Sequence, residues 1–224
     1  MPKYSRAPLA SRAHAPHNQC SPSSRRSTPM AYASLATGVL LAAGTGSRFD
    51  PHGLRNKLLA PLPEGTCVAR ESAQRLLRVV PKVIAVVRPG AETLAHVLND
   101  AGCDVVFAPD AARGMGASLA AGVDADHEAE SWIVALADMP CISVESIEAV
   151  ARSLDGGAPL VAPYYRGQRG HPVGFGYAHR AALVALDGDA GARSLLSSHP
   201  LTRVEVDDPG ILRDIDTPAD LNGL

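Results

Sequence analysis

The stretch VLLAAGTGSRFDPHGLRNKLL, residues Val39–Leu59, begins as an apolar run and breaks off into small residues, two glycines, an arginine and a lysine. Such a continuous apolar run is typical of a strand buried on both faces of a parallel sheet. Gly44 and Gly46 allow backbone N–H groups to approach a ligand closely. Arg48 and Lys57 supply the forked and the point-like cation that bind phosphate. The stretch therefore predicts a first strand followed by an anion-binding loop, with a tight turn carrying two solvated cations as the alternative.

Strand and helix patterns alternate from about Leu35 to the end of the chain. We expect strands at residues 37–43, 82–87, 104–109 and 132–137, and helices at 68–80, 91–102, 116–125 and 143–154. Ser143 is the expected N-cap of the last of these helices. Weaker patterns follow at residues 159–165, 171–177, 181–186, 192–199 and 202–206. Buried strands with helices between them predict an α/β fold, with a mostly parallel sheet covered on both faces, in a single domain over residues 35–224.

The composition fits one globular domain and disfavours several classes of protein. With 224 residues, 46% of them apolar and 20% charged, the chain can bury a core, and no run approaches the roughly 18 apolar residues of a membrane-spanning helix. The formal net charge of -2 does not favour nucleic acid as a partner. No two cysteines are spaced as C-x-x-C, which argues against a zinc site or a disulfide framework and favours a reduced, cytoplasmic protein. The cysteines are Cys20, Cys67, Cys103 and Cys141.

Residues 1–34 differ from the rest of the chain. They are rich in Pro, Ser, Ala and Arg, contain no acidic residue and lack the apolar core of a secretory signal. Because such a composition buries too little apolar surface to offset the entropy of ordering, we expect a disordered basic tail. The tail is either a non-structural extension, since Met30 closely precedes the first strand, or a targeting or anion-binding arm.

The glycine loop matches neither common phosphate fingerprint. In the dinucleotide pattern G-x-G-x-x-G that would begin at Gly44, Phe49 stands in place of the third glycine. The acidic residue expected about 20 residues further on is Glu64, which lies in a Pro-Gly loop rather than at a strand end. In the P-loop pattern Ser or Thr follows the lysine, whereas Leu58 follows Lys57. A dehydrogenase is therefore disfavoured.

Carboxylates follow two further predicted strands. Asp138 comes directly after the strand at 132–137, and Asp214 and Asp216 alternate, so that they share one face of an extended segment. Ligands bind outside the carboxyl ends of the strands in such sheets, and Mg²⁺ takes one or two carboxylates together with substrate phosphates. The alternative is capping, in which Asp138 caps the following turn and one of the other two serves the helix start at Thr217.

A series of motifs follows the glycine loop in a fixed order. After LLAAGTGSR and its lysine come ADMP, RGHPVGF, GDAGAR and DIDTPADL. Together they resemble the MobA-like nucleotidyltransferase family, and within it most closely the molybdenum cofactor cytidylyltransferases. The resemblance covers residues 35–224. It implies a Rossmann-like, three-layer α/β/α fold with a mixed sheet, and a Mg²⁺-dependent reaction of a nucleoside triphosphate with a phosphorylated acceptor.

The resemblance also implies roles for individual residues. The nucleotide-binding positions match Leu41, Ala42, Ala43, Gly44, Gly46, Ser47, Arg48, Lys57, Gly114 and Ser118. The catalytic positions match Lys57, Arg48 and Asp138. The metal ligands match Asp138 and Asp216, with Asp214 as the second choice for the latter. The acceptor-side loops match Arg169, His171, Asp189 and Arg193.

Several of these residues have a structural alternative. Ser118 would stand in the first turn of a helix with a glycine-rich entry. His171 would hydrogen-bond a backbone carbonyl, and Asp189 would cap the helix pattern at 192–199. Arg193 would form a salt bridge on the surface of that helix.

The implied reaction is transfer of CMP from CTP to the phosphate of molybdopterin, with release of pyrophosphate. Family members that use GTP usually have glycine at the position of Ala43, whose methyl group would exclude a purine. The segment between Arg48 and Lys57 is longer than is usual in the family. This insertion either reshapes the triphosphate loop or places Arg55 where another cation would sit.

Three other functions stay open. They are a guanylyltransferase on the same acceptor, a sugar- or alcohol-phosphate nucleotidyltransferase, and a non-catalytic carrier of a pterin cofactor. The expected partners are CTP or GTP, a molybdopterin-type acceptor, and a molybdoenzyme or its maturation factor. Neither nucleic acid nor a membrane is expected to be a partner.

Overall fold

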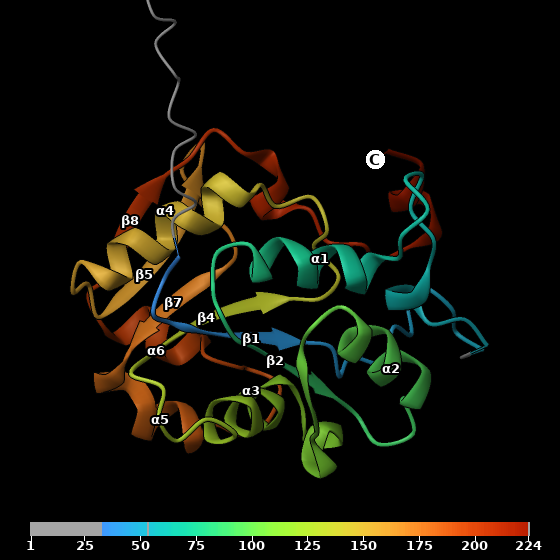
Figure 1. The fold of residues 1–224 in the computed structure, drawn as a ribbon, viewed down its shortest axis with the longest axis horizontal. Coiled ribbons are helices and arrows are strands. Elements are labelled where there is room, and N and C mark those ends of the chain that lie inside the picture. The colour runs from blue at the N-terminus through green and yellow to red at the C-terminus, as the bar shows by residue number, and fades with distance from the viewer. Residues whose placement is uncertain (1–32, 53, 224) are drawn as a thin grey trace, which may run out of the picture. The chain divides into compact units, whose positions relative to one another are not determined.

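The computed structural model describes residues 33–52 and 54–223 (Figure 1). Of the tail predicted at 1–34, therefore, all but the last two residues lie outside the described part. Ser34 is buried, its N–H donates to the carbonyl of Val79 (2.9 Å), and its hydroxyl donates to Asp155 (3.0 Å). The packed part of the chain thus includes this residue.

An eight-stranded mixed sheet forms the centre of the fold. Its strands are β1 (Thr37–Leu41), β2 (Val83–Val87), β3 (Asp104–Phe107), β4 (Ser131–Leu136), β5 (Leu160–Tyr165), β6 (Gln168–Arg169), β7 (Val173–Gly176) and β8 (Thr202–Glu205). The strand order is β3-β2-β1-β4-β7-β5-β6, and β8 pairs with β5. The pairs among β1 to β4 and the β5–β8 pair are parallel, whereas β7 runs antiparallel to β4 and β5, and β6 to β5. The predicted mixed, mostly parallel sheet is confirmed.

Helices cover both faces of this sheet. They are α1 (Val68–Leu77), α2 (Glu92–Asp100), α3 (Met115–Asp124), α4 (Val144–Asp155), α5 (Arg180–Val184) and α6 (Arg193–Ser198). Alternate residues of β1 enter two separate cores: Leu40 packs with Leu76 and Val150 of α1 and α4, and Val39 packs with Leu119 of α3. Figure 1 accordingly shows α1 and α4 above the sheet and α3 and α5 below it. The α/β fold with helices on both faces is therefore confirmed.

Two element boundaries follow local signals in the sequence, the start of α4 and the end of β3. The Ser143 hydroxyl accepts from the N–H of Ser146 (3.1 Å) and so caps α4 as predicted. The strand expected at 104–109 is shorter, because Pro109 cannot donate to a strand ladder and instead opens a 3₁₀ helix, η2 (Pro109–Arg113). None of the helices in the described residues is long and apolar enough to cross a membrane.

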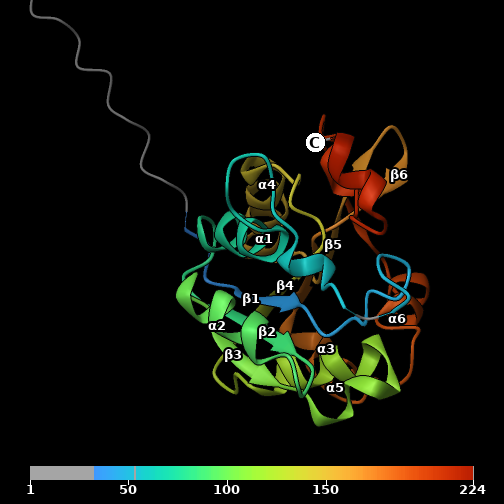
Figure 2. The same cartoon turned by 90° about the vertical axis from the view of Figure 1, so that its right-hand side faces the viewer.

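The order of the strands places a crevice between the ends of β1 and β4. The chain runs from β1 outward to β2 and β3, then returns to place β4 on the other side of β1. The carboxyl ends of β1 and β4 are adjacent, with Leu41 in register with Leu136, and the N–H of Ala137 donates to the carbonyl of Leu41 (3.0 Å). Figure 2 views the sheet from these ends. This reversal of strand order is where open α/β sheets bind ligands.

A carboxylate joins the start of α4 to the C-terminal segment. Asp208 accepts from the N–H of Ser143 and the hydroxyl of Ser146, both at 2.8 Å, and from the N–H of Gly210, also at 2.8 Å. Burial alone would raise the pKa of Asp208, but these hydrogen bonds outweigh it and hold the pKa below its ordinary value of 3.8. The segment that leads to Asp214 is thereby held against the loop that follows β4.

Asp208→Asn is expected to lower the free energy of unfolding at neutral pH by about 1–3 kcal/mol, because the amide replaces one acceptor oxygen by a donor. A group with a depressed folded-state pKa stabilises the protein above its ordinary pKa of 3.8, and this contribution is lost as the pH falls through the folded-state value. Denaturant unfolding should therefore show a difference from the wild type that shrinks as the pH falls below the ordinary pKa. Asp207→Asn, at the exposed neighbour, is the control. A difference that persists unchanged in acid would contradict this assignment.

Candidate functional site

A cavity of about 530 Å³ opens at the switch point between β1 and β4. It is lined by the loop after β1, the start of α3, the end of β4 and the segment around Asp214. All residues predicted to bind nucleotide line it: Leu41, Ala42, Ala43, Gly44, Gly46, Ser47, Arg48, Lys57, Gly114 and Ser118. Asp138, Asp216 and Asp189 line the same cavity. The structure thus brings the predicted nucleotide, catalytic and metal residues together, and their roles stay predictions.

The glycine loop makes a tight turn over Lys57. Gly46 has a φ of 66°, and its carbonyl accepts from the N–H groups of Phe49 (2.9 Å) and Asp50 (3.2 Å). A side chain at Gly46 would be strained by this φ, and its Cβ would stand 3.4 Å from Cγ of Lys57. At Gly44 a Cβ would meet no atom within 4 Å, so packing within the protein does not require glycine there. The loop therefore leaves open space at Gly44 and passes close to the stem of Lys57 at Gly46.

The insertion after Arg48 folds on itself. The carboxylate of Asp50 accepts from the N–H groups of His52 (3.0 Å) and Arg55 (2.7 Å), and these hydrogen bonds hold its pKa below the ordinary value. Phe49 is buried, and the Arg55 guanidinium lies 5.7 Å from the centre of its ring. Because Arg55 is not among the residues that line the cavity, the structure does not support its use as a substitute cation.

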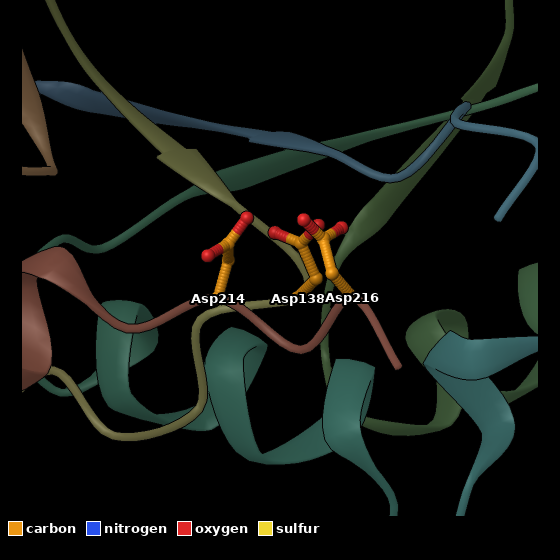
Figure 3. A group of neighbouring side chains, drawn as sticks. All are labelled: Asp138, Asp214 and Asp216. Carbon is orange, nitrogen blue, oxygen red and sulfur yellow. The ribbon is translucent and has the colours of Figure 1, made fainter. Parts of the chain in front are cut away.

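Three carboxylates gather beyond the carboxyl end of β4. One oxygen from each of Asp138, Asp214 and Asp216 lies within 4.8 Å of the others, and Figure 3 shows the three side chains pointing to the same side. Asp138 lies two residues after the end of β4, and the N–H of Ile215 donates to its carbonyl (2.8 Å). This backbone bond fixes the alternating aspartates on either side of Ile215 against Asp138.

The capping alternatives for these aspartates are not what the structure shows. Asp220 instead accepts from the N–H of Asp216 (3.0 Å) and from the N–H and hydroxyl of Thr217 (2.7 and 2.9 Å). The Asp138 carboxylate bonds to Lys57 rather than to the following turn. Capping by Asp220 leaves the carboxylates of Asp214 and Asp216 available to the cluster.

Two cations contact the cluster. Nζ of Lys57 lies 2.6 Å from Oδ2 of Asp138 and 3.2 Å from Oδ1 of Asp216, and Nη1 of Arg48 lies 2.5 Å from Oδ2 of Asp216. The Lys57 side chain is only 11% exposed, whereas that of Arg48 is 75% exposed. Burial would lower the pKa of Lys57, but attraction to Asp138 and Asp216 outweighs it and raises that pKa. Lys57 is therefore charged at neutral pH.

Asp214 is the member of the cluster without a contact to either cation. Burial and the negative charges of Asp216 and Asp138 raise its pKa above the ordinary value. Carboxylate oxygens gathered within 4.8 Å fit a hard divalent cation, which would relieve this repulsion. The residues present therefore fit a metal site formed by all three aspartates, one more than the predicted pair.

A glycine at the start of α3 permits a close backbone contact on the other side of the cavity. Gly114 has a φ of 122°, and a Cβ there would lie 2.4 Å from both Oδ1 of Asp189 and the carbonyl carbon of Gly188. The N–H of Gly116 donates to the carbonyl of Gly188 (2.8 Å). This contact brings Asp189 to the lining of the cavity of about 530 Å³. Asp189 does not cap α6, whose N-cap is Ala192.

Gly114→Ala is expected to cost about 2–5 kcal/mol of stability, because the methyl group would overlap backbone atoms at a φ that already disfavours alanine. Gly157→Ala is the matched control, since Gly157 also has a positive φ (93°) but its Cβ would meet nothing within 4 Å. The control should cost only about 1–2 kcal/mol. The measurement is denaturant unfolding, and equal losses in the two variants would contradict the close contact.

A second cavity of about 160 Å³ adjoins the first and shares Leu41, Met115 and Leu136 with it. Its lining is mostly apolar and includes Arg169, His171 and Arg193. The structure thus divides the four residues predicted on the acceptor side: these three line the smaller cavity, and Asp189 lines the larger one.

The polar groups of this smaller cavity are short of partners. Burial lowers the pKa of His171 to about 4, so its ring is neutral at pH 7, although a hydrogen bond to the backbone of Val134 opposes the shift. Its Nδ1 is buried and finds no hydrogen-bond partner among the described residues. Within that same part of the chain neither Arg169 nor Arg193 forms an ion pair, so the surface salt bridge considered for Arg193 is not present. These groups are available to a ligand.

Sequence reasoning missed part of the lining. Leu136 could have been found from its register with Leu41 across β1 and β4. Thr45, Leu58, Ala111 and Ala112 also line the larger cavity. The alanines lie in η2, where no local pattern marks them, because only the packing of η2 and α3 against the sheet brings them to the site.

The crossover of strands, the glycine loop and the lysine–aspartate cluster define a Rossmann-like α/β protein with its site at the topological switch point. The chain belongs to the MobA-like NTP transferase family, whose domain matches residues 38–204. It is thus a nucleotidyltransferase-family protein, as the motifs predicted.

Two relatives and one solved structure are similar to this chain over most of its length. The chain is 32% identical over 190 residues to the nicotine blue oxidoreductase of Paenarthrobacter nicotinovorans, covering 81% of this chain and 92% of the relative. It is 26% identical over 183 residues to the molybdenum cofactor cytidylyltransferase of Escherichia coli K12, covering 81% and 91%. The crystal structure of Rv0371c from Mycobacterium tuberculosis in complex with manganese has a TM-score of 0.68 at 26% identity, covering 84% of this chain and 97% of that one. The two enzymes carry the names of different activities.

Proposed function

We propose that this protein is a Mg²⁺-dependent cytidylyltransferase that transfers CMP from CTP to the phosphate of a molybdopterin-type acceptor and releases pyrophosphate. The observation that carries the proposal is the contact of the buried Lys57 with Asp138 and Asp216 at the edge of a cavity that also contains the glycine loop. Phosphate-binding and metal-binding groups thus converge on one cavity, as nucleotidyl transfer requires.

Each part of the site has a task in this reaction. The open backbone around Gly44 receives the triphosphate, and Lys57 and Arg48 offset charge on the leaving pyrophosphate. An oxygen of the acceptor phosphate forms a bond to the α-phosphorus in line, while the bond from that phosphorus to the bridging oxygen of pyrophosphate breaks. Asp138, Asp214 and Asp216 would hold Mg²⁺, which supplies further charge neutralisation on the phosphate oxygens. The protein contributes positioning and electrostatics, and the acceptor itself is the nucleophile.

The smaller cavity supports an aromatic acceptor with a phosphate group. Its apolar lining, which includes Phe175 and Met115, suits a flat ring system, and Arg169 and Arg193 suit the phosphate. The neutral ring of His171 can hydrogen-bond a heterocycle through its unpartnered Nδ1. Because this cavity shares Leu41, Met115 and Leu136 with the larger one, an acceptor there would adjoin the nucleotide.

The proposed preference for CTP rests on Ala43. This residue lines the larger cavity, where its methyl group reduces the room for a base.

A cytoplasmic location is proposed with the reaction, in line with the free thiols of Cys67, Cys103 and Cys141.

A second candidate is an oxidoreductase that acts on an aromatic compound. It is favoured by the 32% identity to the nicotine blue oxidoreductase. It is disfavoured by Phe49, which is buried where the dinucleotide fingerprint needs a glycine, and by an acidic cluster that hydride transfer does not require.

Pyrophosphate release by the purified protein tests the proposal. It should be measured with Mg²⁺ and each of CTP, GTP, ATP and UTP, with and without molybdenum-loaded molybdopterin. Release that needs both CTP and the pterin supports the proposal, and release with GTP reverses the base assignment. The same assay with a sugar phosphate in place of molybdopterin tests the acceptor, and release with the sugar phosphate alone refutes the pterin assignment. Pterin binding without release indicates a carrier. A parallel assay of NADH or NADPH oxidation with nicotine blue tests the second candidate.

A further inference from the structure

Lys57 and Arg48 lie on the carboxylates where a divalent cation would bind. Between them they contact one oxygen of Asp138 and both oxygens of Asp216. Two positive side chains thus neutralise much of the charge of three gathered aspartates. A metal ion that enters this cluster must compete with an ammonium group that already bonds to two of the three carboxylates.

The two cations differ in how readily they leave. Arg48 is largely exposed and pairs with Asp216 alone, so solvent screens its contact. Lys57 is nearly enclosed and bonds to both Asp138 and Asp216, so that its departure would leave Asp138 without a counter-charge and Asp216 with only the exposed Arg48. Lys57 is therefore the effective barrier to metal binding.

The stem of Lys57 runs under the glycine loop. A Cβ at Gly46 would lie 3.4, 3.7 and 3.9 Å from Cγ, Cδ and Cβ of Lys57, so the side chain passes alongside Gly46 on its way to the cluster. Lys57 and the loop line the same cavity. A phosphate group received by the loop would therefore lie within reach of the ammonium and offer it an alternative anion.

We propose that Lys57 serves as an exchangeable counter-ion, which occupies the acidic cluster in the free protein and releases it to a divalent cation only when nucleotide phosphate draws the ammonium away. The inference rests on the proposed function for the identity of that anion. It assigns a binding order to the site: the free protein binds the metal ion weakly, and nucleotide strengthens that binding. By linkage, the metal ion strengthens nucleotide binding by the same factor.

Metal affinity in the absence of turnover tests this exchange. Mn²⁺ binding to the free protein can be followed by the EPR signal of the unbound ion, without nucleotide or acceptor. Lys57→Met should bind Mn²⁺ at least about tenfold more tightly than the wild type, because the competing charge is gone. Lys82→Met is the matched control: Lys82 also pairs with an aspartate, Asp126 (3.1 Å), but lines a different cavity. Its Mn²⁺ affinity should equal that of the wild type.

A second measurement starts from the wild-type protein. In the wild type, saturating CTP without acceptor should tighten Mn²⁺ binding, after subtraction of the Mn²⁺–CTP complex measured without protein. In Lys57→Met this gain should be markedly smaller. The inference is overturned if folded Lys57→Met binds Mn²⁺ with wild-type affinity, or if CTP does not tighten Mn²⁺ binding to the wild type.

These outcomes are separate from those of the proposed function. A protein that shows the exchange but releases no pyrophosphate with molybdopterin refutes the proposed acceptor and leaves the exchange intact. If release depends on the acceptor but Lys57→Met binds Mn²⁺ with wild-type affinity, the proposed function is supported and the exchange is refuted.

Discussion

Asp138→Asn is expected to lower the rate of pyrophosphate release by about 10³-fold or more, with little change in stability. The amide keeps the size of the carboxylate but removes one of the charges that gather within 4.8 Å. It also replaces an acceptor of the 2.6 Å bond from Lys57, so that both the metal-binding group and the position of the lysine are disturbed. The rate should be measured at saturating Mg²⁺ and CTP, together with the thermal unfolding midpoint.

The control for this variant is Asp124→Asn, at an exposed aspartate at the end of α3 that pairs with Arg180 (3.3 Å). It should keep the rate of the wild type. A folded Asp138→Asn protein with the wild-type rate at every Mg²⁺ concentration would refute the assignment of this residue to the metal.

The parts of the site whose positions the sequence predicted depend on local properties. The apolar run of β1, the small residues after it and the cations that follow are neighbours in the chain, so the loop could be recognised without any long-range contact. The alternation of Asp214 and Asp216 likewise predicted that both carboxylates face the same side, which the cluster confirms.

The parts that the sequence did not predict depend on distant contacts. Asp208 bonds to Ser143, 65 residues earlier, and nothing near either residue marks the pair. The packing of Gly114 against Gly188 and Asp189 similarly decides that Asp189 lines the larger cavity rather than the smaller one. Such contacts exist only after the sheet has brought the segments together, so motif order alone could not divide the acceptor-side residues between two cavities.

The second half of the sheet was also difficult to predict for a physical reason. β6 is two residues long and β8 is mostly exposed at an edge of the sheet, so neither shows the continuous apolar run that identified β1 and β2. β8 is held by its parallel pairing with β5, from Val161–Thr202 to Tyr164–Glu205. Its position therefore comes from backbone pairing more than from the side chains that sequence analysis uses.

Lys57→Ala is expected to lower kcat/KM for CTP by about 10²–10³-fold, because the charge that binds the triphosphate and stabilises the leaving pyrophosphate is lost. Lys57→Arg should restore only part of this activity. The lysine side chain is 11% exposed and its ammonium fits between Asp138 and Asp216, whereas a guanidinium is larger and planar. The measurement is pyrophosphate release across a range of CTP concentrations at saturating Mg²⁺.

The two effects expected of Lys57 have opposite signs, and this distinguishes its role from a structural one. Loss of the ammonium should weaken the interaction with CTP while it strengthens the binding of Mn²⁺ to the free protein. A variant that merely disturbed the cavity would weaken both, since the same aspartates and the same loop line it. A fall in both affinities in a folded Lys57→Ala protein would therefore show that the lysine supports the architecture of the site rather than exchanging between its two anions.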